Sequence, residues 1–276
     1  MIYIKSPEEI RIIKEGGRLL AKILASLAEQ LRPGLETAAL EDLALKLIDA
    51  AGGRPAFKNY PMGGGIFFPS AVCVSINDEV VHGASLPNRV IKAGDIVDLD
   101  IGMEWPVQEN LRRQYKAPLN PHSTSGGFFT DMCATYGIGK ISVEAKKLLR
   151  VSRECLNLAI KEVKPGNTIN DLARAVERQA DKYGYGVVRD LVGHGVGYFA
   201  HERPDVYNFV IPENSPDNII LKSGMVIAIE PMINAGDWRV KIAKNGYTVV
   251  TADHSLSAHF EHTVAVTDKG MEILTI

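Results

Sequence analysis

The chain has 276 residues, of which 46% are hydrophobic and 23% charged, and its formal net charge is −2. This composition is typical of a globular protein with a large core, and the near-neutral charge gives no basis for binding DNA or a membrane surface. Three cysteines at unpaired spacings exclude a disulfide framework. With no secretion signal and no apolar run of roughly 18 residues, we expect a soluble, cytoplasmic protein.

The first half opens with two predicted helices. Ser6, Pro7 and Glu9 form a capping box with proline at the first helical position, which predicts a helix starting at residue 7. A Pro-Gly turn follows, and Thr37 is expected to cap the second helix. The glycine clusters in "PMGGGIFF" and "STSGGFF" are typical of loops or hairpin tips. The stretch "KAGDIVDLD" then predicts a strand that ends at Asp100.

The second half repeats this order. "SVEAKKLLRVSRECLNLAIKEV" predicts a long helix, "VKPGNTINDLARAVERQADKYG" a Pro-Gly turn and a second helix, and "KSGMVIAIE" a strand that ends at Glu230. Two repeats of this length are not a solenoid, whose repeats are short and numerous. We therefore predict one α+β domain over residues 1–276, with pseudo-repeats at about 1–135 and 136–276 whose matching strands meet at the centre.

Four carboxylates occupy equivalent places in these halves. Asp100 and Glu230 end the matched strands, and Asp131 and Glu261 are each expected in a later strand of their half. If the halves face each other, the four acids converge, and four buried carboxylates cannot all stay ionised without compensation. Two divalent cations supply four compensating charges, so the pattern predicts a dinuclear metal site.

The neighbouring residues leave alternatives open. Asp98 would share a strand face with Asp100, but its counterpart in the second half is Ala228, which favours Asp100 as the ligand. A histidine would complete the site, and "LVGHGVGYFAHERP" supplies His194 and His201. We expect Cys73 to be a half-buried strand residue, and we assign the remaining unmatched histidines to the surface: His122, His254 and His259.

Six stretches of the chain together resemble the signature blocks of type I methionine aminopeptidases. They are "VCVSINDEVVHG", "GDIVDLDIG", "DMCATYGIGKIS", "GHGVGYFAHERP", "VIAIEPMI" and "SLSAHFEHTVAVT", and they occur in the family's order over nearly the whole chain. The resemblance implies the pita-bread fold, with two pseudo-twofold related α/β halves around a central antiparallel sheet. It also implies a monomeric hydrolase that removes the N-terminal methionine from nascent proteins.

The resemblance further implies a role for each residue of the site. A metal-bridging hydroxide would attack the first peptide bond, with Glu230 as proton shuttle and His82 and His201 beside the substrate. The metal would be Co, Mn, Fe or Zn, since the ligands include no thiolate. The five implied ligands are Asp100, Asp131, His194, Glu230 and Glu261. The implied methionine pocket contains Tyr60, Phe68, Cys73 and Tyr247.

Two stretches depart from the family pattern. A short hairpin usually joins the first two aspartates, whereas residues 101–130 separate them here, which predicts an inserted loop at about 104–128. Its Pro, Ser, Thr and Gly content predicts an exposed, mobile excursion, and its basic residues Arg112, Arg113 and Lys116 suggest a contact with ribosomal RNA. The second departure, "PMGGG", lies beside Tyr60 and raises the possibility of a displaced pocket wall.

Two other functions fit parts of this pattern. A proline-directed peptidase has the same fold but usually carries an additional N-terminal domain, whereas this sequence begins directly at the catalytic fold. A metal-free binding protein on the same scaffold would have lost ligands, and all five are present. Metal content and methionine release from a short peptide distinguish the three.

Overall fold

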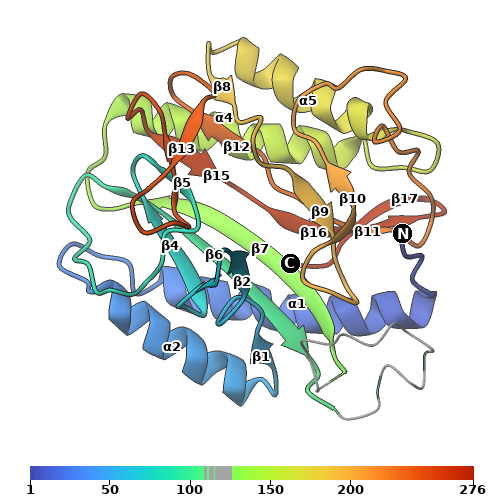
Figure 1. Cartoon of the computed structure of the whole chain (residues 1–276), viewed down its shortest axis with the longest axis horizontal. Helices are drawn as coiled ribbons and strands as arrows, with labels where there is room; N and C mark the ends of the chain where they lie inside the picture. The colour runs from blue at the N-terminus through green and yellow to red at the C-terminus, as the bar shows by residue number, and fades with distance from the viewer. Residues whose placement is uncertain (109–110, 112–114, 116–125) are drawn as a thin grey trace.

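The computed structural model describes residues 1–108, Leu111, Tyr115 and residues 126–276. Two pairs of helices lie on opposite sides of a layer of β-strands (Figure 1). One pair is α1 (Pro7–Ala28) and α2 (Thr37–Ala50), and the other is α4 (Val143–Lys161) and α5 (Ile169–Asp181). Among the helices described, none has the length and apolar character that crossing a bilayer requires.

The strands form two main antiparallel sheets. In the first, β6 (Ile96–Trp105) pairs with β7 (Phe128–Gly137) along one edge, and with β4 (Val72–Ile76) and β1 (Arg54–Pro55) along the other. The second has the order β10 (Glu202–Val206), β9 (Gly193–Gly195), β11 (Val226–Ile229), β16 (His262–Thr267) and β17 (Gly270–Ile273).

Smaller sheets surround these two. One contains β15 (Ser257–His259), β12 (Met232–Asn234) and β8 (Gly186–Val187), and another β13 (Val240–Ile242), β14 (Val249–Thr251) and β5 (Glu79–Val81). The "PMGGGIFF" stretch is the expected hairpin, with β2 (Pro61–Gly63) and β3 (Ile66–Phe67). Its three glycines have positive φ angles of 59–91°, which side-chain-bearing residues rarely adopt.

The two sheets meet where β7 lies against the chain around residue 260. Ala134 and Phe260 form an isolated antiparallel bridge, and Glu261 N donates to the Cys133 carbonyl at 3.1 Å. Thr263 Oγ1 accepts from Asp131 N at 3.0 Å and donates to its carbonyl oxygen at 2.7 Å. These bonds fix the two later acids, one from each half, against each other.

The helix starts agree with the sequence at one place and differ at another. Ser6 and Glu9 form the predicted capping box of α1. Thr37, however, is the first residue of α2 and not its cap, because Glu36 occupies the cap position. The Thr37 hydroxyl instead donates to the Ser85 carbonyl at 2.7 Å and accepts from Arg89 N. It therefore ties α2 to the loop before β6.

The predicted strand ends also need correction. Glu230 directly follows β11, as expected, but β6 continues past Asp100 to Trp105 because β7 pairs with it over its whole length. Asp131 lies in β7, whereas Glu261 lies between β15 and β16. The acids of the two halves therefore lie in the same region of the fold, but those of the first half lie within strands and those of the second half lie just outside them.

Residues 104–105 and 128, at the ends of the predicted loop, belong to β6 and β7. Its expected exposure is wrong at Leu111, which is buried in an apolar cluster with Ile12 and Ile13. Tyr115 donates a hydrogen bond to Glu8 of α1. The other predictions for this loop concern Arg112, Arg113, Lys116 and His122, which lie outside the described residues.

Candidate active site

A cavity of about 420 Å³ opens between the two sheets and brings together most of the residues predicted for the site. Its walls carry the five candidate ligands together with apolar and aromatic side chains. The lining includes Tyr60, Phe68, Cys73, His82, Asp100, Asp131, His194, His201, Glu230 and Glu261. Of the predicted site residues, Tyr247 alone is not part of the wall.

The strand register explains how the acids converge. Asp100 in β6 pairs with Cys133 in β7, and Asp131 pairs with Gly102, so the two aspartates are diagonal neighbours on one face of the sheet. In the second sheet, Glu230 follows β11 where Glu261 precedes its partner β16. We call Asp100, Asp131, Glu230 and Glu261 the acid cluster.

His194 completes this group with its ring in a defined orientation. Its Nδ1 lies 2.9 Å from the Gly195 carbonyl oxygen, which can only accept, so Nδ1 carries the proton. The other ring nitrogen, Nε2, lies 3.3 Å from Glu230 Oε1 and 4.0 Å from Asp131 Oδ2. A hydrogen bond of this kind to one ring nitrogen is the usual support for a metal on the other.

Asp100, Asp131 and Glu261 of the acid cluster are buried, and Glu230 is half-buried. Burial raises the pKa of Asp100 to about 7, with His259 opposing it and Asp98 and Glu230 adding to it. Burial, together with the neighbouring acids, also raises the pKa of Asp131 and of Glu261 well above the usual range. Within the described part of the chain, one oxygen of each acid accepts no hydrogen bond: Asp100 Oδ1, Asp131 Oδ1, Glu230 Oε1 and Glu261 Oε1.

His201 and Tyr60 form the wall beside the acid cluster. Tyr60 Oη lies 2.8 Å from His201 Nδ1, so the hairpin glycines leave Tyr60 in place at the cavity. Burial, together with the neighbouring His194 and His82, lowers the pKa of His201 well below its usual range. Burial likewise lowers the pKa of His82. Both rings are therefore neutral near pH 7 and each can donate one N–H.

Phe68, Cys73 and Tyr60 line the apolar part of the cavity, and Tyr247 stands one layer behind them. Its ring meets Phe68 edge-on with centroids 5.5 Å apart. Cys73 is fully buried, not half-buried as predicted, because β4 is covered by β6 on one edge and by the hairpin region on its face. Sequence reasoning missed several apolar wall residues: Phe57, Met62, Val81, Leu191, Val192 and Met232.

The comparisons with known proteins agree with this geometry. The sequence profile described as metallopeptidase family M24 matches residues 11–108 and 122–268. The chain belongs to metallopeptidase family M24. The resemblance read from the six sequence blocks, the pita-bread fold and the assignment as a hydrolase are thereby confirmed.

Named relatives of this M24 metallopeptidase cover its full length. The methionine aminopeptidase of Clostridium acetobutylicum and methionine aminopeptidase 1 of Bacillus subtilis are each 40% identical over 276 residues, with 100% of this chain and 99% of the relative covered. The crystal structure of methionine aminopeptidase from Thermotoga maritima has a TM-score of 0.86 at 38% identity, with 100% of this chain and 99% of that chain covered.

Membership of a metallopeptidase family implies divalent metal ions, and the residues present fit them. Asp131, His194 and Glu261 offer ligand atoms that lie within 4.8 Å of one another. Carboxylate oxygens and an imidazole nitrogen such as His194 Nε2 are ligand types that divalent transition metals accept. Cations there would stabilise the ionised carboxylates that burial disfavours.

The assignment of the unmatched histidines to the surface is correct for one and wrong for another. His254 is exposed and pairs with Asp78 at 2.9 Å. His259 is only 1% exposed and lines the cavity, because the chain at β15 packs against β7 and buries the ring beside Asp98. Burial would lower the pKa of His259, but Asp98 and Glu230 outweigh it and raise the pKa to about 10.

Proposed function

We propose that this chain is a methionine aminopeptidase that removes the N-terminal methionine from newly made proteins. The observation that carries the proposal is one cavity whose wall combines four carboxylates, each with an oxygen that accepts no hydrogen bond from the described residues, with aromatic rings and sulfur. Aromatic faces and a thiol suit the flexible, polarizable methionine side chain. The 40% sequence identity, over the full length of the chain, to enzymes named for this activity supports the same substrate.

We propose that two divalent metal ions bind here, with Asp100, Asp131, His194, Glu230 and Glu261 as ligands and Asp131 and Glu261 as the bridging pair. Two dications balance the four negative charges of the acid cluster, and carboxylate-bridged metal pairs lie roughly 3.5–4 Å apart. Oxygen and imidazole ligands without a thiolate suit Co, Mn, Fe or Zn. The approach of Asp131 to Glu261 across the junction of the sheets supports their bridging role.

When bound, such metals lower the pKa of water and polarise the scissile carbonyl. Glu230, next to His194 at the cavity wall, would take the proton of the attacking water and pass it to the leaving amine. His201, held by Tyr60, would donate its N–H to the oxygen that gains charge. Neutral His82, which also lines the cavity, would hydrogen-bond the substrate.

The test measures both products and metal. Metal-loaded protein should release methionine from Met-Gly-Met-Met and contain two equivalents of metal, and a chelator should abolish release. Protein that releases no methionine from any peptide, or that binds no divalent metal, would contradict the proposal. Preferential cleavage before proline would favour the proline-directed peptidase of the same fold.

We further propose that the enzyme works in the cytoplasm, where new chains emerge with their methionine. The contact with ribosomal RNA stays a prediction, since its basic residues lie outside the described part of the chain.

A further inference from the structure

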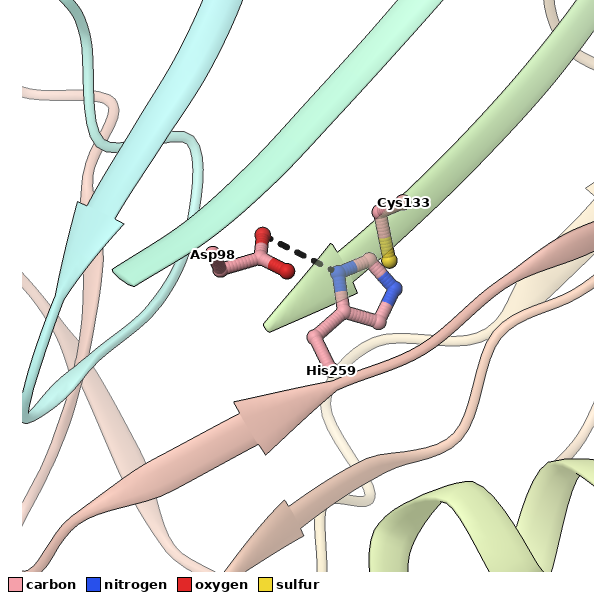
Figure 2. Close-up of side chains that lie close together, drawn as sticks. All are labelled: Asp98, Cys133 and His259. Carbon is pink, nitrogen blue, oxygen red and sulfur yellow. Dashed lines mark ion pairs between the residues drawn. The ribbon is translucent and has the colours of Figure 1, made fainter. Parts of the chain in front are cut away.

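A fifth acid and a histidine lie directly behind the acid cluster. Asp98 of β6 and His259 of β15 are both buried, and Figure 2 shows their side chains pointing toward one another beside Cys133 of β7. Neither the duplicated strands nor the proposed reaction assigns them a role. Asp98 has no acidic counterpart in the second half, where Ala228 occupies the matching place.

The His259 ring lies between two carboxylates. Its Nδ1 is 3.6 Å from Asp98 Oδ2, and its Nε2 is 3.6 Å from Glu230 Oε2. Within the described residues neither ring nitrogen has a hydrogen-bond partner, so these two acids are the acceptors that each nitrogen faces. Contacts of this length are longer than a hydrogen bond, and such bonds in active sites commonly tighten when ligands bind.

The backbone of His259 is fixed by Thr135, which also reaches Asp98. His259 N donates to Thr135 Oγ1 at 2.9 Å, and this hydroxyl lies 2.8 Å from the His259 carbonyl oxygen and 3.2 Å from Asp98 Oδ1. Asp98 and Thr135 are direct partners in the β6–β7 register. The ring therefore extends from a rigid junction of the two halves toward Glu230.

We propose that His259 is a positioning residue that orients the Glu230 carboxylate, with Asp98 orienting the His259 ring in turn. The inference rests on the proposed function, in which Glu230 is both ligand and proton carrier. A carboxylate held on one oxygen by His259 presents the other, Oε1, to His194 and the metal side of the cavity. Such outer partners of ligands typically change metal affinity or activity by roughly 10–100-fold when removed.

A positioning role fits this geometry better than a third metal ion, because each ring nitrogen of His259 faces one carboxylate. Asp98, Cys133 and His259 do offer ligand atoms within 4.8 Å of one another, a set that a transition metal accepts. A dication there would be repelled by the two metal ions proposed for the acid cluster. A third metal site is therefore one of the outcomes that the experiment distinguishes.

The experiment compares His259→Gln, Asp98→Asn and the double variant with wild type. Metal-free proteins are titrated with Mn²⁺ in a calorimeter, and kcat and KM for Met-Gly-Met-Met are measured at saturating Mn²⁺. The matched control is His254→Gln, which removes a histidine from an exposed ion pair with Asp78. Cys133→Ser tests the third-metal reading.

We expect His259→Gln to weaken Mn²⁺ binding or lower kcat by roughly 10–100-fold with KM unchanged. Asp98→Asn should have a smaller effect, and the double variant should be no worse than His259→Gln, because Asp98 acts through the ring. His254→Gln should match wild type. If His259→Gln fails to fold, Asp98→Asn still decides: wild-type Mn²⁺ affinity and kcat in that variant would overturn the proposal.

Other outcomes would overturn it as clearly. Additive losses in the double variant, or a lower melting temperature with unchanged Mn²⁺ affinity and kcat, would make the pair merely structural. A third metal equivalent that disappears in Cys133→Ser would assign the cluster to a metal. If wild type binds metal and releases methionine, and His259→Gln has the same Mn²⁺ affinity and kcat, only this inference is contradicted. If wild type neither releases methionine nor binds metal, the proposed function itself is contradicted.

Discussion

Two groups of largely buried carboxylates in this molecule differ in their hydrogen-bond partners. Glu202 and Glu9 accept hydrogen bonds on every carboxylate oxygen. Glu202 accepts from Lys5 and from the backbone N–H groups of residues 198 and 199. Glu9 accepts from Ser6 and from the Tyr198 hydroxyl. In the acid cluster each of the four side chains keeps an oxygen that accepts no hydrogen bond from the residues the structure describes. The difference separates a structural use of buried acids from a functional one.

The Lys5 network (Lys5, Glu9 and Glu202) contains its own cation. Lys5 Nζ lies 2.5 Å from Glu202 Oε2, and the two side chains are 1% and 0% exposed. A buried ion pair with full hydrogen bonding is internally balanced, and nothing needs to be added to it. Three of the four acid-cluster side chains are similarly buried without such a cation beside them, which supports the proposal that metal ions balance their charge.

The largest expected effect comes from removing one acid of the acid cluster, which tests whether these acids serve activity and not stability. Asp131→Ala or Glu261→Ala should abolish methionine release, because a bridging ligand is lost. Neither variant should lose stability in the metal-free state, since an uncompensated buried acid is costly to fold. Peptide turnover and thermal unfolding with and without Mn²⁺ check this, and Mn²⁺ should raise the melting temperature of wild type alone. Near wild-type turnover with full metal occupancy would show that the assignment is wrong.

Lys5→Met tests the other side of the comparison. It leaves Glu202 buried without its cation, which should lower the free energy of unfolding by about 3–5 kcal/mol. Adding Glu202→Gln should restore part of this loss. The control is Arg150→Met, which breaks an exposed Arg150–Glu154 pair four residues apart on α4 and should cost far less, because solvent screens the pair. Equal losses from Lys5→Met and Arg150→Met in urea unfolding would contradict the structural role of the Lys5 network.

His201 distinguishes donors from ligands within the site. His201→Ala should lower kcat by roughly 10²–10³, the usual loss for one donor to a developing oxyanion. Metal content should stay that of wild type. Elemental analysis of the purified variant decides this, because loss of metal would make His201 a ligand and remove His194 from that role.

The sequence predicted the acid cluster because the duplication marked it. The tripeptides "DLD" and "AIE" occur at matching places in the two halves, and the structure brings their last residues, Asp100 and Glu230, to one cavity. The strand boundary at Asp100 was not predictable in the same way. Whether β6 stops there or continues depends on the pairing offered by β7, which lies beyond the inserted loop. Local propensity carries no information about a partner so far along the chain.

His259 was misplaced although a signal for it existed. It lies two residues before Glu261, and in an extended chain residues two apart share a face. The same period links Asp98 to Asp100. Applied to the stretches before Asp100 and before Glu261, that rule would have predicted Asp98 and His259 close to the candidate ligands. The apolar wall has no such signal, because Phe57 and Met62 reach the cavity only through the fold of short segments such as the β2–β3 hairpin.

Adjacent phenylalanines of that hairpin provide the finest test, since Phe68 is 2% exposed at the cavity wall and Phe67 is 59% exposed. Wild type should prefer Met over Leu at the first position, and one missing methylene or clash in such a pocket is worth about 1–3 kcal/mol in kcat/KM. Phe68→Ala enlarges the pocket, so it should reduce the Met-to-Leu ratio of kcat/KM. Phe67→Ala should leave the ratio unchanged, because its ring contributes no wall. A panel of peptides that differ only in the first residue measures both ratios. Equal turnover of Met and Leu peptides by wild type would refute a methionine pocket here, and an equal change in both variants would place the selectivity outside the cavity, in the hairpin as a whole.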